Sequence, residues 1–290
     1  MKVKQYIKNI SDERWNIGFI QNPLEYILSG ESLKVGWMKH SYKDRWFADP
    51  FILDVTDDII HVLAEEFYKP IKRGRIAHLI IDRNSYELKQ LNVVLELPTH
   101  LSYPAIVRKD GKVFICPENG ESGTLNLYEY DSKNFQCKKV ECLLKENVAD
   151  ATMTTLDGKS YLFCTKHPHP NGNTLHIYEK NENGRFSPYK EYAFDENVAR
   201  MAGDFFEYEE KLYRPTQECN TQYGHAVTLQ EVQKKGDEFY FKEVRRLYSV
   251  HPKLNVGMHT FNMYKGVIVT DALGFDNMWI RNVLKTLKVL

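Results

Sequence analysis

The sequence comprises 290 residues, in which 39 Lys and Arg balance 39 Asp and Glu, so the formal net charge is zero. A chain without excess positive charge has no general electrostatic attraction to nucleic acid or to an acidic membrane surface. The sequence shows neither a signal-peptide h-region nor a run of about 18 apolar residues, which predicts a cytoplasmic protein without a membrane span. The five cysteines have no metal-binding spacing and are expected to be reduced and packed.

Five segments of the sequence share one layout: a polar residue, an alternating strand, a tight turn, a second strand and another polar residue. They span residues 49–66, 103–118, 150–165, 202–217 and 259–271. The first residues of successive segments lie 54, 47, 52 and 57 positions apart, and a repeat of that size indicates a repeat architecture. Two of the turns, Asp110-Gly111 and Asp157-Gly158, carry the strongest short-range signal for a β-hairpin.

Two further strand-like runs follow each of the first four hairpins, which gives four strands and about fifty residues per unit. This pattern predicts an all-β fold, a five-bladed β-propeller with four-stranded blades that forms one domain over residues 1–290. The blades are expected at roughly 45–98, 99–147, 148–197, 198–250 and 251–273, the last being short of strands. Residues 15–20 are expected to complete it, because such pairing hides sheet edges. Apolar residues at helical spacing predict a short C-terminal helix over 277–290.

The hairpin layout also predicts where function lies. The first strand of each hairpin runs away from one face and the second returns, so the opening and closing residues meet at one mouth of the central channel. The predicted ring consists of Asp49, Glu65 or Glu66, Ser102, Tyr103, Glu118, Asp150, Thr165, Gln217, Glu218, His259 and Asp271. Within it, Glu66 is the expected substrate contact from the first returning strand. The alternative is that hairpin ends are polar merely because they are exposed.

Two aspartates of the ring open blades one and three. Asp49 precedes Pro50, which restricts its backbone to an extended conformation, and Asp150 faces it obliquely across the channel. Paired carboxylates in different environments are the usual apparatus for glycosidic bond chemistry, one as acid and the other as base or nucleophile. The alternative for each is an aspartate at a hairpin end with no catalytic role.

The second blade tip combines His100, Ser102 and Tyr103 with Glu118 at the end of the hairpin. Sugar hydroxyls need planar polar partners beside aromatic faces, and this tip offers both. The predicted roles are substrate binding for the first three residues and a catalytic one for Glu118. The alternative is a capped loop in which the histidine makes hydrogen bonds only within the protein.

The fourth tip carries two arginines, Arg200 and Arg214, with a polar group consisting of Gln217, Glu218 and Tyr223. A guanidinium binds carboxylate or phosphate through two parallel hydrogen bonds, which favours an anionic substrate such as a sugar nucleotide or an acidic sugar. Internal ion pairs with nearby acids are the alternative.

The fifth tip contributes His259 and Asp271, as acid–base groups or as substrate contacts. No residue spacing in the sequence demands a metal ion. The sequence contains no nucleotide-binding glycine loop, so no cofactor is predicted.

Several of these motifs resemble a known family. Residues 100–104 (HLSYP), 200–203 (RMAG) and 214–217 (RPTQ), together with Glu118, Asp150, His259 and Asp271, are similar to the N-terminal domain of plant glucosamine inositolphosphorylceramide transferases. The resemblance covers residues 44–271. Its bacterial relatives are stand-alone proteins or are fused to formyltransferase-like domains in polysaccharide biosynthesis. The resemblance implies glycan metabolism, although glycosyl transfer in the plant proteins is attributed to a separate C-terminal domain that this sequence does not contain.

A more distant resemblance is to five-bladed propeller glycosidases such as glycoside hydrolase family 43. It implies a general base at Asp49 and a pKa-tuning carboxylate at Asp150. The blade-four glutamate of those enzymes is absent, because Arg200 begins that segment here.

We therefore expect a carbohydrate-active protein of bacterial surface polysaccharide or glycolipid biosynthesis that transfers a glycosyl group. Asp49 is the expected base or nucleophile, Asp150 its tuning partner and Glu118 the acid. The substrate is a sugar nucleotide or a glycan. The alternatives are a glycosidase, and a non-catalytic glycan-binding module that serves a partner glycosyltransferase or formyltransferase-like enzyme.

Overall fold

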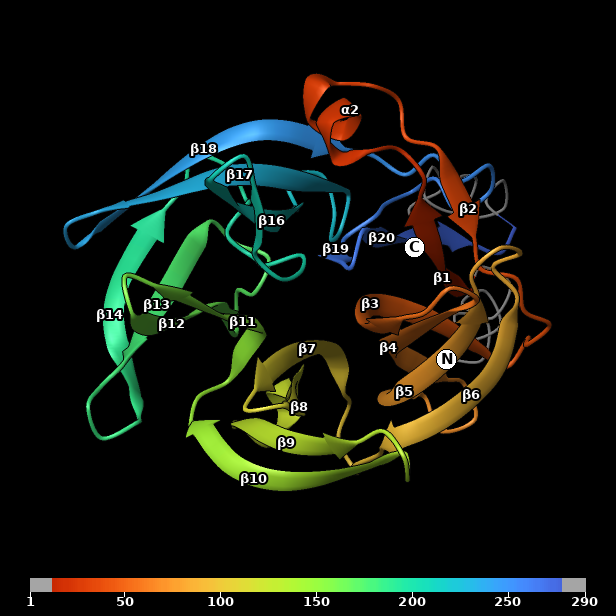
Figure 1. Cartoon of the computed structure of the whole chain (residues 1–290), viewed down its shortest axis with the longest axis horizontal. Helices are drawn as coiled ribbons and strands as arrows, with labels where there is room; N and C mark the ends of the chain where they lie inside the picture. Colours follow the sequence, from red (N-terminus) through yellow and green to blue (C-terminus); the bar gives the residue numbers. More distant parts are fainter. Residues whose placement is uncertain (1–11, 278–290) are drawn as a thin grey trace, which may run out of the picture.

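The computed structural model describes residues 12–277 and arranges them as five antiparallel sheets of four strands around a central channel (Figure 1). The first four blades follow the chain. Blade one holds β3 (Arg45–Val55), β4 (Ile59–Tyr68), β5 (Arg73–Asp82) and β6 (Leu88–Leu95), and blade two holds β7 (Ser102–Lys109), β8 (Lys112–Glu118), β9 (Leu125–Asp131) and β10 (Gln136–Leu144). Blade three holds β11 (Val148–Leu156), β12 (Lys159–Lys166), β13 (Thr174–Lys180) and β14 (Phe186–Ala193). Blade four holds β15 (Phe206–Tyr208), β16 (Lys211–Glu218), β17 (Ala226–Lys235) and β18 (Glu238–Leu247). The predicted all-β, five-bladed propeller with four-stranded blades is confirmed.

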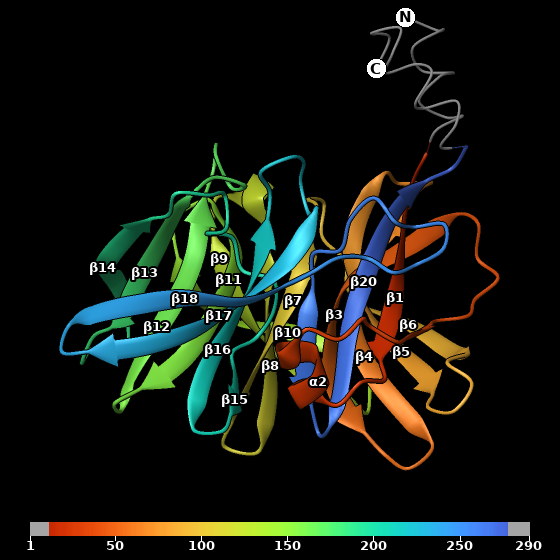
Figure 2. The ribbon, with the colours of Figure 1, turned by 90° about the horizontal axis from the view of Figure 1, so that it is seen from above.

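The fifth blade joins the two ends of the described chain. Its strands β19 (Phe261–Tyr264) and β20 (Val267–Phe275) are continued by β1 (Glu13–Ile20) and β2 (Val35–Trp37). β1 pairs with β20 along its whole length, from Glu13 opposite Phe275 to Ile20 opposite Ile268, and the two strands run side by side in Figure 2. This pairing removes the free edge that an open ring would leave.

Helix is scarce in the described chain. The sequence pattern did not predict the short α2 (Leu24–Ser29), which buries Leu24 and Ile27 and ends at Gly30 in a left-handed conformation. The helix predicted over 277–290 falls, except for its first residue, outside the described residues. Within residues 12–277 we find no helix with the length and apolar character needed to cross a membrane.

The innermost strands of blades one, two and three share a backbone distortion within their first five residues. Asp49, Tyr103 and Asp150 all have positive φ, of 50°, 44° and 47°, and each lies at a break in the strand register. Such β-bulges re-aim a side chain and are enriched beside functional sites. In blade four the corresponding position is Gly203. An added Cβ there would lie 2.1 Å from the Phe261 carbonyl oxygen.

Candidate functional site

A cavity of about 460 Å³ opens at the mouth of the channel, on the face where the hairpins begin and end. This is within the size range of small-ligand sites. Its walls are aromatic and its floor is polar, and the lining residues are Asp12, Glu13, Trp15, Trp46, Ala48, Glu65, Phe67, His100, Ser102, Glu118, Arg200, Tyr223 and His259. Aromatic faces beside carboxylates and imidazoles form the combination that suits sugar rings and their hydroxyls.

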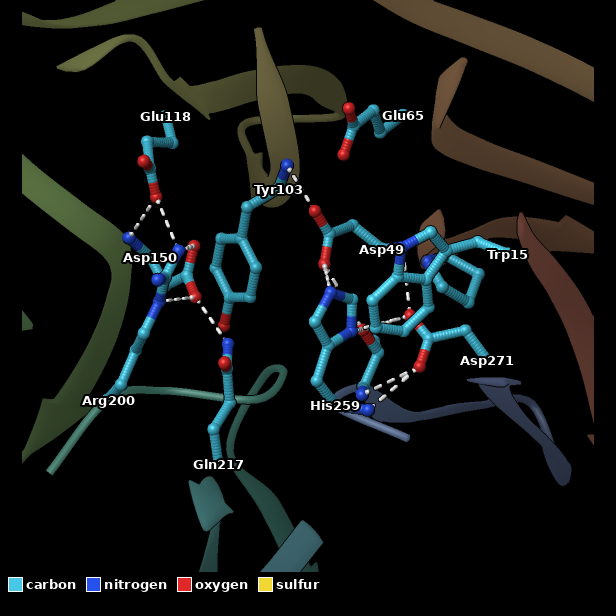
Figure 3. Close-up of polar contacts among 12 residues, drawn as sticks. Trp15, Asp49, Glu65, Tyr103, Glu118, Asp150, Arg200, Gln217, His259 and Asp271 are labelled. Carbon is cyan, nitrogen blue, oxygen red and sulfur yellow. Dashed lines mark hydrogen bonds and ion pairs between the residues drawn. The ribbon is translucent and has the colours of Figure 1, made fainter. Parts of the chain in front are cut away.

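One side of the floor is a buried cluster of Asp49, His259 and Asp271 (Figure 3). His259 Nδ1 lies 2.7 Å from Asp271 Oδ2, and its Nε2 lies 3.6 Å from Asp49 Oδ1. Burial alone would lower the pKa of His259, but the charges of Asp271 and Asp49 raise it to about 9. Trp15 stacks on the imidazole with 4.0 Å between ring centroids. His259 is therefore an imidazolium at neutral pH.

The same three residues hold potential metal-ligand atoms within 4.8 Å of one another. In the structure, however, each ring nitrogen of His259 faces a carboxylate, which is the arrangement of an imidazolium. A metal ion binds only neutral imidazole. A divalent cation at Asp49 and Asp271 would thus require His259 to lose its proton.

The other side of the floor is a cluster around Arg200. Its Nε lies 2.6 Å from Asp150 Oδ2 and its Nη2 lies 3.1 Å from Glu118 Oε2, while Gln217 Nε2 donates to Asp150 at 2.5 Å. Burial opposes ionisation of Glu118, but Arg200 lowers the pKa of that carboxyl to about 2. Burial raises the pKa of Asp150, and Arg200 opposes that rise. The arginine is thus neutralised by two carboxylates, and its guanidinium also lies 5.1 Å from the Tyr223 ring.

Glu65 projects from β4 into the cavity beside His100. The backbone N–H of Gly74 donates to His100 Nδ1 at 3.0 Å, which places the proton of the neutral ring on Nε2, 3.2 Å from Glu65 Oε1. An added Cβ at Gly74 would lie 2.5 Å from that oxygen, so a glycine is needed for this approach. Burial raises the pKa of Glu65, and the charge of Asp49 adds to the rise.

Tyr103 lies between the two clusters (Figure 3). Its ring is fully buried, and its hydroxyl lies 2.8 Å from Thr152 Oγ1 and donates to the Gly203 carbonyl at 3.1 Å. The tyrosine therefore spans from blade two to blades three and four. The predicted substrate contact through its side chain has no exposed atom to make it.

The structure brings most of the predicted residues together. Six of them line the cavity directly, namely His100, Ser102, Glu118, Arg200, Tyr223 and His259. Five lie immediately behind this lining, namely Asp49, Tyr103, Asp150, Gln217 and Asp271.

Three predicted binding residues lie elsewhere, and Thr165 of the predicted ring, which is fully buried, is also absent from the lining. Glu66 points to the opposite face of β4 from Glu65 and pairs with Arg45 and Arg75, at 2.6 Å each. Arg214 is fully buried in blade four, where it donates to the Val198 carbonyl and to Gln230. Glu218 accepts the Asn220 backbone N–H at 2.6 Å. The cavity lining includes none of the three.

Sequence reasoning left Glu65 as an alternative to Glu66. It did not propose six other residues that line the cavity, namely Asp12, Glu13, Trp15, Trp46, Ala48 and Phe67. The signal for Glu65 was available, because successive side chains of a strand point to opposite faces, but the strand register decides which of two adjacent glutamates faces the channel. Trp15 lies in the strand that was predicted to close the ring. Its position beside His259 follows only from the pairing of β1 with β20.

Comparison with known proteins identifies the family to which the chain belongs. The family model described as glucosamine inositolphosphorylceramide transferase 1, N-terminal, matches residues 32–270. The glucosamine inositolphosphorylceramide transferase 1 of Arabidopsis thaliana is 28% identical over 214 residues, and that of Oryza sativa subsp. japonica is 29% identical over 213. These alignments cover 71% and 70% of this chain and 28% of each relative, so the chain spans less than a third of their length.

Solved structures share the fold at low identity. The GH43_1 enzyme from Xanthomonas citri complexed with xylose has a TM-score of 0.54 at 10% identity, covering 95% of this chain and 92% of that one. A GH43 β-xylosidase/α-arabinofuranosidase from a compost microbial metagenome has a TM-score of 0.51 at 11% identity, covering 82% and 92%. Identities this low establish the likeness of fold alone. The match of the family model over most of the sequence shows that the chain belongs to the family of the N-terminal part of glucosamine inositolphosphorylceramide transferase 1.

Proposed function

We propose that this chain is a carbohydrate-active propeller that binds a sugar at the channel mouth and takes part in glycosyl transfer. The observation that carries the proposal is Glu65: a buried carboxyl with a raised pKa that faces an aromatic-walled cavity beside a second buried carboxyl, Asp49. The plant relatives are named glucosamine inositolphosphorylceramide transferases, which supports the reaction class.

The charges at the mouth favour a neutral sugar or an amino sugar. Four carboxyl groups line the cavity, those of Asp12, Glu13, Glu65 and Glu118. Its two cations, Arg200 and His259, already face buried carboxylates, and Arg214 lies outside the lining. A diphosphate would therefore meet no unpaired cation here. We accordingly favour a glycan or an amino sugar over the sugar nucleotide that the two arginines had suggested.

The roles follow from the protonation states. Glu118 is a poor acid near neutral pH because its pKa is about 2, whereas burial keeps a larger protonated fraction on Glu65. Glu65 would donate its proton to the leaving oxygen as the glycosidic bond breaks. Burial raises the pKa of Asp49 as well, although the charge of His259 opposes the rise, and the ionised Asp49 would accept the proton of the attacking hydroxyl. Asp150 and Arg200 would set the electrostatic potential at the opposite wall of the cavity.

A second candidate is a glycan-binding module without chemistry of its own. One observation favours it: the Asp49 carboxylate already accepts the Tyr103 backbone N–H at 3.0 Å and lies 3.2 Å from the Thr260 hydroxyl. An oxygen engaged in this way holds blades together and is less available as a base. In this proposal a partner glycosyltransferase or formyltransferase-like enzyme of a cytoplasmic glycan pathway supplies the chemistry.

A calorimetric titration tests the proposed function. Glucosamine, N-acetylglucosamine, neutral oligosaccharides and a uridine diphosphate sugar are titrated into the protein and into Glu65→Gln. We expect saturable binding of a neutral or amino sugar and weaker binding of the nucleotide. We also expect transfer of a glycosyl group from an oligosaccharide to a second sugar only by the unmodified chain. Binding without turnover in both proteins would favour the binding module. No sugar binding at all would overturn the proposal.

A further inference from the structure

A second cavity, of about 560 Å³, lies at the opposite end of the channel. It is bounded by the β3–β4, β7–β8 and β19–β20 turns of blades one, two and five. Arg108 follows Tyr103 by five residues, and Tyr264 follows His259 by five, which at the rise of a strand places this level roughly 16 Å below the mouth. The two cavities share no lining residue and are separate sites.

Arg108 is held in place at this cavity by uncharged groups. Its guanidinium carbon lies 3.8 Å from the centroid of the Tyr264 ring. Its Nη2 donates to the backbone carbonyls of Ile52 and Leu53, at 2.8 and 2.9 Å. Among residues 12–277 no carboxylate forms an ion pair with it. An arginine that is oriented in advance and has no ion-pair partner in contact with it is suited to bind an anionic group through its remaining N–H donors.

The other charges at the rim largely cancel. Lys265 pairs with Asp54 at 2.6 Å, and Lys112 pairs with Glu129 at 2.8 Å. Within the described chain Lys109 has no ion pair, and Asp110 stands at the exposed turn. Among the lining residues, Arg108 and Lys109 thus face a single unpaired carboxylate, which leaves the lining with a positive excess, in contrast to the carboxylate-rich mouth. The carboxyl of Asp204, outside the lining, also interacts with Arg108, and burial raises its pKa to about 7.

A hydrogen-bonded chain adds a neutral donor. His78 Nδ1 lies 2.7 Å from the Tyr130 hydroxyl, and its Nε2 lies 2.9 Å from His61 Nδ1. Burial lowers the pKa of His78 to about 4 and that of His61 as well, so both rings are neutral. If Tyr130 donates to His78, each hydrogen along the chain finds an acceptor, and the last N–H, on His61 Nε2, is left for the cavity. The opposite polarity would leave the buried tyrosine hydroxyl without an acceptor.

We propose that this lower cavity binds a small organic anion, in which a phosphate or carboxylate meets Arg108, Lys109 and His61 while an apolar or aromatic part contacts Leu53 and Phe135. The cavity volume is within the range of small-molecule sites, and it combines apolar lining with a few convergent polar donors. The site stands apart from the proposed function, because it shares no lining residue with the mouth.

The test uses phenyl phosphate, benzoate and uncharged benzyl alcohol as probes, titrated into ¹⁵N-labelled protein and followed by amide chemical shifts. We expect saturable binding of one or both anions with shifts at the three turns, at least tenfold weakening in Arg108→Gln, and no saturation by benzyl alcohol. Arg185→Gln is the matched control, since Arg185 is exposed in blade three, away from this cavity. A preference between the two anions identifies the phosphate or carboxylate group.

Three results would overturn the proposal: no saturation by either anion, equal binding by Arg108→Gln, or equal binding of benzyl alcohol. Arg108 is exposed at the rim, so the variant is expected to fold, and a melting temperature within about 2 °C of the unmodified protein checks this. Because Glu65→Gln alters only the mouth, it should leave anion binding unchanged. The two proposals can therefore fail independently.

Discussion

Asp49 and Tyr103 occupy equivalent bulges in neighbouring blades, and the carboxylate of the first accepts the backbone N–H of the second at 3.0 Å. The same link is repeated around the ring: Asp271 accepts the Asp49 N–H, and Glu118 accepts the Asp150 N–H. A carboxylate with this role satisfies a buried donor that the distorted strand cannot pair with its own sheet. The channel carboxylates therefore connect blades as well as lining a site.

This link predicts different results for two substitutions at one position. Asp49→Ala leaves the buried Tyr103 N–H without an acceptor and should lower the free energy of unfolding by about 2–3 kcal/mol. Asp49→Asn keeps an oxygen for that donor and should cost less. Hydrogen exchange of the Tyr103 amide is the specific readout. It should accelerate in Asp49→Ala and stay slow in Asp49→Asn; equal exchange in both would show that the carboxylate does not secure this amide.

The His259 cluster predicts a pH dependence of stability. The pKa of His259 is about 9 in the folded protein and about 6.5 when unfolded. Its stabilising contribution is thus fully present below about pH 6.5 and is lost as pH rises through 9. The loss amounts to about 3 kcal/mol. Denaturant unfolding at pH 6 to 10 should show this decline in the unmodified chain, and the part due to the imidazole should be missing in His259→Gln. Parallel curves for the two proteins would refute a charged His259.

Adjacent glutamates of β4 provide a matched pair of variants. Glu66→Gln breaks two ion pairs of a fully buried carboxylate and should destabilise the fold by about 3 kcal/mol, leaving sugar binding intact. Glu65→Gln replaces a buried carboxyl that faces the cavity with an amide of the same shape. It should change the free energy of unfolding by less than about 1 kcal/mol and abolish transfer. Melting curves and product assays on both variants separate the two roles, and the reverse pattern would place the site behind β4.

Tyr223 offers a test of the aromatic wall. It is 38% exposed, lines the mouth and lies over the Arg200 guanidinium. Tyr223→Ala should weaken sugar binding about tenfold, which corresponds to about 1.4 kcal/mol. Tyr240→Ala, on the outer strand of blade four and 54% exposed, is the control and should bind normally. Equal affinities in calorimetric titrations of the two variants would argue against a sugar stacked at this wall.

The blades were predictable from the sequence because their signals are local. Turn residues such as Asp110 and Gly111 take positive φ, of 51° and 72°, wherever the hairpin lies, and alternation in the flanking strands depends only on neighbours in the chain. The clustering of Asp49, Asp150, Glu118 and Asp271 near one mouth follows from the hairpin layout for the same reason.

Tertiary structure alone decided which of these side chains reach the cavity. Arg200 and Arg214 lie within one predicted tip, yet one joins the floor and the other is enclosed between Phe194 and Phe241. Glu65 faces the mouth and Glu66 faces away from it. The direction of a strand side chain reverses with a register shift of one residue, and bulges, not local sequence, set that register here. The sequence by itself thus determined the ring of blades and the types of residue at its mouth. Packing between distant blades determined which of these groups are accessible, which are charged and which only stabilise the fold.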